Sequence, residues 1–165
     1  RDNDPVYVME NTTLYGNTGE VPDPADGDFL IPLGKADIKR EGSDISLIAH
    51  GASVLRCLEA ADILANEHNI DAEVVDLRSI RPLDQDAIIE SVKKTNRAVL
   101  VDESKPFCGV SAQITTLIQE YAFDYLDAPV KRVCTIDAPA IYSPHVEQDQ
   151  LPNAKRIVAQ VLTIA

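Results

Sequence analysis

The sequence has no long apolar run, few cysteines and a shortage of basic residues. No apolar stretch approaches the roughly eighteen residues that a membrane span needs, and no charged-then-apolar leader is present, so we expect neither a membrane span nor a secretory signal. Its 15 Lys and Arg stand against 27 Asp and Glu, giving a net charge of −12. This charge argues against nucleic acid and anionic membranes as partners, because phosphate binding needs clustered cations. It favours a basic protein partner, or simply high solubility.

The three cysteines are an odd number without metal-ligand spacing, which indicates a reducing compartment. Cys57 falls on the apolar stripe of a predicted helix and Cys134 in a strand-like run, so we expect both in the core and Cys108 exposed. No zinc site and no catalytic Cys-His pair can be built from them. The length of 165 residues suits one domain with a proper core. Because the chain begins at Arg1 without an initiator methionine, we expect it to be a piece of a longer protein.

Composition divides the chain into three parts. Residues 5–10 have the pattern of a strand, whereas residues 16–34 hold four of the seven glycines and three prolines, which predicts a linker. We therefore expect 1–15 to be the end of a preceding domain, 16–34 a connector and 35–165 the main domain.

Short apolar strands alternate with amphipathic helices throughout the predicted main domain. The strands are expected at 45–50, 72–77, 97–102 and 130–136, with a further edge strand at 35–40, and the helices at 52–67, 84–94, 109–121 and from 152 onward. This alternation predicts βαβ units and a mainly parallel sheet covered on both faces, which is an α/β fold with a three-layer α/β/α sandwich.

Polar side chains follow the predicted strands at their carboxyl ends, where open α/β sheets usually place function. His50 leads directly into a helix N-terminus. It is therefore either a general acid or phosphate contact, or a hydrogen-bonded filler beside a helix cap at Ser53 or a neighbour. Arg78 and Arg81 could clamp a carboxylate or phosphate, or pair with nearby acids to lock the sheet edge or a subunit interface.

The acids at these ends do not complete a catalytic set. Asp102 and Glu103 are adjacent in sequence, so a strand points them to opposite faces and they make a poor acid–base pair. From the residues alone we assign no catalytic, cofactor-binding or metal residue. A binding or assembly domain is therefore favoured over an independent enzyme.

Four ordered stretches resemble one family, namely residues 6–16, 29–36, 76–84 and 126–129 followed by the 139–152 loop. They resemble the β subunit of pyruvate dehydrogenase, the decarboxylating component, from the end of its pyrimidine-binding domain through its transketolase-like C-terminal domain. The resemblance implies an enzyme that uses thiamine diphosphate and Mg²⁺ to decarboxylate pyruvate and acetylate a lipoyl group. That family's cofactor contacts lie in the N-terminal domain of the subunit, so we expect this fragment to bind no cofactor and to be inert by itself.

The same resemblance implies the partners of the domain. These are an α subunit and a second β subunit in an α2β2 tetramer, and the small, basic subunit-binding domain of the dihydrolipoyl acetyltransferase. The matching docking positions are Asp127 and the terminal carboxylate of Ala165, although Asp127 could instead cap the turn before Pro129.

Three other assignments stay open at this point. Branched-chain 2-oxoacid and acetoin dehydrogenases share this domain, and a free-standing protein that binds a small anion near His50 and Ser53 is a further alternative. The resemblance places the protein in a mitochondrial matrix or a bacterial cytoplasm.

Overall fold

The centre of the molecule is a mostly parallel sheet. The computed structural model describes residues 2–23, 25 and 27–165; Arg1, Pro24 and Asp26 lie outside the described residues. In this part of the chain the sheet has five strands in the order β1-β3-β2-β4-β5. The strands are β1 (Asp37–Arg40), β2 (Ile45–Ala49), β3 (Ala72–Asp76), β4 (Ala98–Asp102) and β5 (Lys131–Cys134). β1 pairs antiparallel with β3, and the other neighbours pair in parallel.

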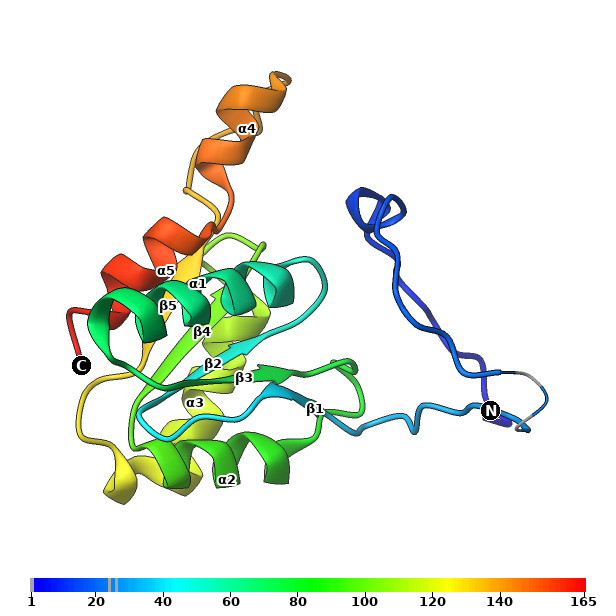
Figure 1. Ribbon diagram of the computed structural model, residues 1–165, viewed down its shortest axis with the longest axis horizontal. Helices are drawn as coiled ribbons and strands as arrows, with labels where there is room; N and C mark the ends of the chain where they lie inside the picture. Colours follow the sequence, from blue (N-terminus) through cyan, green and yellow to red (C-terminus); the bar gives the residue numbers. More distant parts are fainter. Residues whose placement is uncertain (1, 24, 26) are drawn as a thin grey trace.

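Helices cover both faces of this sheet (Figure 1). α1 (Ser53–His68) and α5 (Ala154–Val161) pack on one face, and α2 (Gln85–Thr95) and α3 (Val110–Ala122) on the other. Each pair of helices packs against the sheet and encloses an apolar core on its face. Both faces need such a cover because the central parallel strands consist mostly of apolar residues. The predicted three-layer α/β/α sandwich is confirmed, including the edge strand before residue 41.

Local signals fix the ends of the helices. The Asp84 carboxylate accepts a hydrogen bond from the amide of Ala87 at the start of α2, while its second oxygen accepts one from the amide of Ala36. Asn69 and Asn96, which end α1 and α2, adopt the left-handed conformation that asparagine tolerates. Asp84 thus ties the first turn of α2 to the segment that enters β1.

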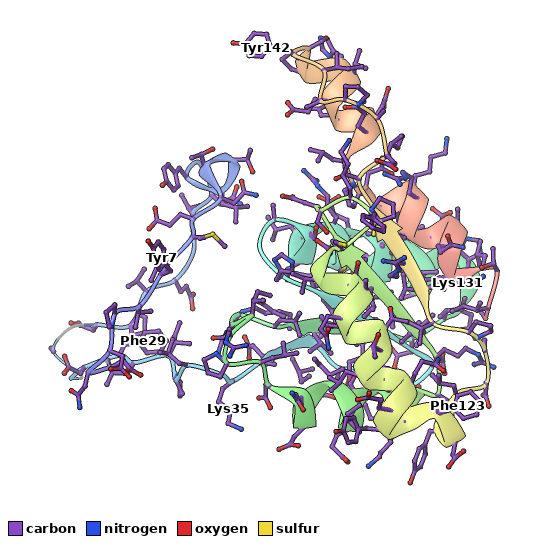
Figure 2. All side chains as sticks on the ribbon, turned by 180° about the vertical axis from the view of Figure 1, so that it is seen from behind. Tyr7, Phe29, Lys35, Phe123, Lys131 and Tyr142 are labelled. Atoms are coloured by element: carbon purple, nitrogen blue, oxygen red, sulfur yellow. The ribbon has the colours of Figure 1, made fainter. Side chains whose placement is uncertain are left out.

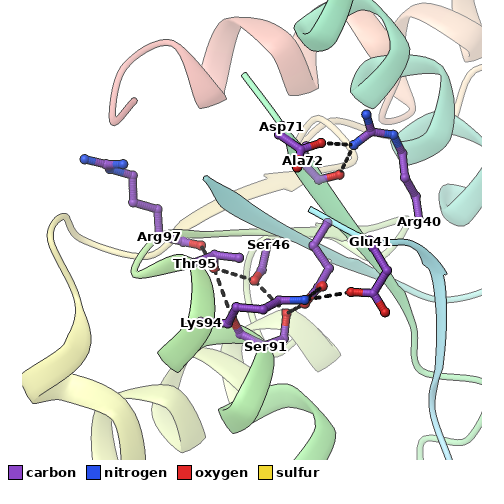
Figure 3. A network of polar contacts seen from close by, with 10 residues as sticks. Arg40, Glu41, Ser46, Asp71, Ala72, Ser91, Lys94, Thr95 and Arg97 are labelled. Atoms are coloured by element: carbon purple, nitrogen blue, oxygen red, sulfur yellow. Dashed lines mark hydrogen bonds and ion pairs between the residues drawn. The ribbon is translucent and has the colours of Figure 1, made fainter. Parts of the chain in front are cut away.

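A buried polar network holds α2 on the sheet (Figure 3). Glu73 of β3 is only 1% exposed, and its carboxylate accepts a hydrogen bond from Ser91 and contacts the ammonium group of Lys94. Ser46 of β2 shares hydrogen bonds of 2.7 Å with Ser91 and with Thr95. Buried polar groups are costly without partners, so this network fixes the position of α2 on β2 and β3.

Two segments differ from the sequence predictions. Residues 5–10 form no strand and are exposed, because no other described strand lies beside them to complete a ladder. The loop expected at 139–152 contains the short helix α4 (Pro144–Gln150), which projects from the body, with Tyr142 fully exposed beside it (Figures 1 and 2). Single 3₁₀ turns occur at η1 (Thr12–Leu14) and η3 (Phe123–Tyr125). None of the described helices is both long and apolar enough to cross a membrane.

Candidate functional site

The order of the strands reverses between β2 and β4, and this point is the candidate site. The connection through α1 places β3 on one side of β2, and the connection through α2 then places β4 on the other side. In open α/β sheets the crevice outside the carboxyl ends of two such strands is where ligands bind. His50 follows β2 and Asp102 ends β4, and both line a small depression there together with Ser111.

Asp102 is the centre of the contacts at this point. Its carboxylate accepts hydrogen bonds from the Ser104 amide at 2.9 Å, the Ser104 hydroxyl at 2.6 Å and the Ser111 amide at 2.9 Å. Burial opposes ionisation of this carboxyl, but the contact with His50 and the hydrogen bonds from Ser104 and Ser111 outweigh it. The pKa of Asp102 therefore lies well below its ordinary value.

The backbone around this carboxylate leaves room for no extra atom. A Cβ on Gly109 would lie 2.1 Å from the Ser104 hydroxyl and 3.0 Å from the Asp102 carboxylate. Asp102 thus draws the first turn of α3 and the preceding loop together. As expected from their adjacency, Asp102 is buried while Glu103 is exposed, so the two do not act as one pair.

His50 lies beside this carboxylate without a hydrogen bond to it. Its Nε2 is 3.7 Å from an Asp102 oxygen, which exceeds hydrogen-bond length. That Nε2 is buried and has no hydrogen-bond partner among the described residues, and the same holds for the hydroxyl of Ser53 in the first turn of α1. The predicted side-chain cap is wrong, since α1 starts after Ala52 without a side-chain hydrogen bond. Two polar groups at the switch point therefore have unused hydrogen-bonding capacity.

The guanidinium of Arg78 is paired with a carboxylate of β1, so it is not free to clamp an anion together with Arg81. The Arg78 guanidinium donates to the Asp37 carboxylate of β1 at 2.6 Å, so its partner is none of the acids near it in sequence. Lys39 donates to the same carboxylate, and Lys39 followed by Arg78 lowers the pKa of Asp37. Arg81 is exposed and precedes Pro82 through a cis peptide bond. This corner of the sheet is therefore held by an ion-pair cluster.

Asp127 lies on the loop between η3 and β5. Its carboxylate is 60% exposed and lies 3.6 Å from the guanidinium of Arg97. Its backbone amide donates to the carbonyl of Asn96, which attaches the loop to the end of α2. Ala165 is exposed at the end of the chain. Asp127 therefore faces solvent from a loop whose backbone is fixed.

Sequence reasoning did not identify Glu73, Ser104 and Ser111 as members of polar clusters. Glu73 stands inside an apolar run, and an acid in a strand buried on both faces is the signal that a partner must exist. Among the described residues, no group of three His, Cys, Asp or Glu side chains is placed to hold a metal ion.

The sheet order and the two-faced helix cover define a doubly wound α/β domain, and the comparisons with known proteins give its family. Residues 34–157 match the family described as "Transketolase, C-terminal domain". The chain belongs to this family. The expected transketolase-like domain is therefore confirmed.

Curated relatives match nearly the whole chain. The β subunit of acetoin:2,6-dichlorophenolindophenol oxidoreductase from Bacillus subtilis is 47% identical over 163 residues, which are 99% of this chain and 46% of the relative. The pyruvate dehydrogenase E1 component β subunit from Rickettsia felis is 45% identical over 161 residues, which are 98% of this chain and 48% of the relative. The chain spans about half the length of these relatives.

A solved structure described as "Split gene transketolase, inactive beta4 tetramer" is similar as well. It superposes with a TM-score of 0.72 at 27% identity, and the match covers 88% of this chain and 45% of that chain. The likeness agrees with the α/β transketolase C-terminal fold.

Proposed function

We propose that this chain is the C-terminal assembly and docking part of the β subunit of a thiamine diphosphate-dependent dehydrogenase that acts on pyruvate. The observation that carries the proposal is the match of 96–99% of the chain to β subunits of pyruvate dehydrogenase E1 components and of acetoin:2,6-dichlorophenolindophenol oxidoreductases, in each case to somewhat less than half of their length. Acetoin dehydrogenase is the alternative, because relatives of both kinds are about equally similar to the chain. A branched-chain 2-oxoacid dehydrogenase is the third candidate for the parent enzyme.

The cofactor does not fit the residues present. Among the described residues no group of three His, Cys, Asp or Glu side chains is placed to hold Mg²⁺, and the guanidinium of Arg78 is already paired with Asp37. We therefore assign no residue here to thiamine diphosphate or Mg²⁺ and derive no catalytic step through them. In the proposal, both belong to the remainder of the parent enzyme.

The proposed role of the chain is to hold partners. The partners are an α subunit, a second β subunit in an α2β2 tetramer, and the basic subunit-binding domain of a dihydrolipoyl acetyltransferase. Support comes from the net charge of −12 and from the exposed carboxylate of Asp127, because an acidic surface speeds encounter with a basic partner and fixes its register. The internal contact with Arg97 is a surface ion pair of roughly 0–1 kcal/mol, which a docking cation could replace at small cost. The same proposal places the protein in a mitochondrial matrix or a bacterial cytoplasm.

Calorimetric titration tests the docking role. The β subunit that carries this chain, assembled with its α subunit, is titrated with the acetyltransferase subunit-binding domain at two salt concentrations. We expect salt-sensitive binding that Asp127→Ala weakens and that removal of the carboxyl-terminal residue Ala165 also weakens. Asp124→Ala is the matched control, since Asp124 is an exposed acid on the same stretch. Equal binding by Asp127→Ala and the parent would refute the docking role of this residue.

A second candidate function is supported by the unused polar groups at the switch point. His50 Nε2 and the Ser53 hydroxyl are buried without a partner among the described residues, beside the N-terminus of the 16-residue helix α1. A small anion such as phosphate suits this position, because helix N-termini attract negative charge. Titration with inorganic phosphate tests it: binding that disappears in His50→Ala supports the site, and absence of any heat in the parent chain refutes it.

A further inference from the structure

A basic groove follows the outer edge of β5, although the chain as a whole is acidic. β5 stands last in the strand order, and among the described residues only β4 pairs with it. A groove of about 320 Å³ follows this edge, and its charged lining consists of Lys131, Arg132 and Arg156 against the single acid Asp137. Figure 2 shows Lys131 at the periphery of the body, where β5 begins.

The cations flank the edge on both faces of the sheet. Val133 belongs to the core under α1 and α5, so Lys131, two residues earlier, points to that same face. Arg132 points to the opposite face, where its guanidinium donates to the carbonyl of Pro106 at 2.8 Å. A strand laid along β5 would direct alternate side chains to these two faces and would meet a cation on each.

The third cation stands at the far end of the edge. The Arg156 guanidinium donates to the carbonyls of Cys134 at 2.6 Å, Gln150 at 3.1 Å and Leu151 at 2.9 Å. These hydrogen bonds fix its position before any ligand arrives and occupy the carbonyl at the end of β5. The stretch from Lys131 to Val133 is therefore the part of the edge that a partner strand can use.

We propose that this edge binds an extended acidic peptide segment of a partner protein by strand addition. Main-chain hydrogen bonds to the free edge would supply affinity, and the cations on the two faces would select acidic side chains at alternating positions. Because the chain as a whole carries a charge of −12, an acidic partner is repelled elsewhere and directed to this groove. The inference does not rest on the proposed dehydrogenase role and uses a surface other than Asp127.

The structural alternative gives the same residues a different purpose. Short, positively charged edge strands keep proteins from pairing edge to edge, and β5 has four residues of which two are cations. In that case the groove would bind no peptide of any charge. A different alternative is that β5 pairs with β5 of a second copy of the chain, so that the same edge forms a dimer.

Fluorescence anisotropy with a labelled hexapeptide of alternating glutamate and valine tests the proposal. We expect saturable binding to the chain that weakens by about tenfold or more in the Lys131→Glu/Arg132→Glu double variant, which corresponds to about 1.4 kcal/mol. Lys155→Glu, an exposed cation of α5 outside the groove, should change binding by less than about twofold. Matching peptides with lysine for glutamate, or with proline for valine, should not bind, because the first reverses the charge and the second cannot add a strand.

Hydrogen exchange gives a readout that does not depend on the variants folding. The peptide should slow exchange of amides within 131–133 of the unmodified chain, and the proline peptide should not. The proposal is overturned by equal binding of the glutamate and proline peptides, by an unchanged affinity in a folded double variant, or by absence of binding. A concentration-dependent dimer that the double variant abolishes would overturn it in favour of self-pairing.

Discussion

Removal of the Lys94 ammonium group should destabilise the chain far more than its half-exposed position suggests. Lys94 contacts both Glu73, which is 1% exposed, and Glu41, which is 79% exposed. In Lys94→Met the Glu73 carboxylate keeps the hydrogen bond from Ser91 but remains as a buried charge without a cation. Loss of one partner of a fully buried pair costs about 3–5 kcal/mol. Because Lys94 itself is 44% exposed and water can partly replace it, we expect about 2 kcal/mol.

Urea unfolding measures this loss. With a slope of about 2 kcal/mol per molar urea, the midpoint should fall by about 1 M in Lys94→Met. Glu41→Gln removes the exposed partner of the same ammonium and is the matched control, with an expected change below about 0.5 kcal/mol. Glu73→Gln added to Lys94→Met should recover much of the loss, since the neutral amide no longer leaves a buried charge. Equal midpoints for Lys94→Met and Glu41→Gln would refute the reasoning.

Three further predictions concern the sheet and its ends. Because the pKa of Asp102 is lower in the folded chain than its unfolded value of about 3.9, its carboxylate stabilises the fold above that value, and this contribution is lost as the pH falls from about 5 toward the folded pKa. Asp102→Asn should therefore be less stable than the parent at pH 7, and its free energy of unfolding should depend less on pH in the acid range. Gly42→Ala should cost about 2 kcal/mol, because its Cβ would lie 2.3 Å from the backbone of β3, whereas Gly19→Ala meets open space. A thiol reagent should modify Cys108 rapidly in the folded chain and Cys57 only after unfolding, because burial raises the pKa of the Cys57 thiol.

Each of these has a result that would contradict it. Parallel acid unfolding curves for Asp102→Asn and the parent would show that this carboxyl does not carry the predicted linkage. Gly42→Ala with the stability of Gly19→Ala would mean that β3 can move aside. Rapid labelling of Cys57 under native conditions, measured by mass spectrometry of peptides, would show that α1 opens readily.

The regular elements of the fold could be predicted because their signals are local. Apolar runs and helical spacing between residues 45 and 121 placed three parallel strands and three helices within a few residues of their observed ends. Helix α4 was not predicted because it is short and projects from the body. Gln150 is its single buried residue among those described, so its sequence has no apolar stripe that would indicate a helix. The strand predicted at 5–10 is absent because an extended pattern forms a strand only where a neighbouring strand completes its hydrogen bonds.

The contacts of the candidate site could be predicted only in part. His50 and Asp102 follow predicted parallel strands, so the sequence placed both at the same edge of the sheet. Their contact, however, requires β2 and β4 to be neighbours, which the spacing along the chain does not determine. Arg78 was predicted either to clamp an anion or to pair with a nearby acid, yet its partner Asp37 comes from an antiparallel strand 41 residues earlier. Long-range pairings of this kind follow from the sheet order rather than from local sequence.

We propose that this domain joins partners and leaves the chemistry to the remainder of the parent enzyme. The most direct test compares two activities of the intact assembly that carries Asp127→Ala in this domain. One is decarboxylation of pyruvate with an artificial electron acceptor, and the other is the overall reaction that also needs the acetyltransferase. We predict an unchanged first activity and a reduced second activity, which excess acetyltransferase restores. Equal loss of both activities, in an assembly that remains α2β2, would contradict it.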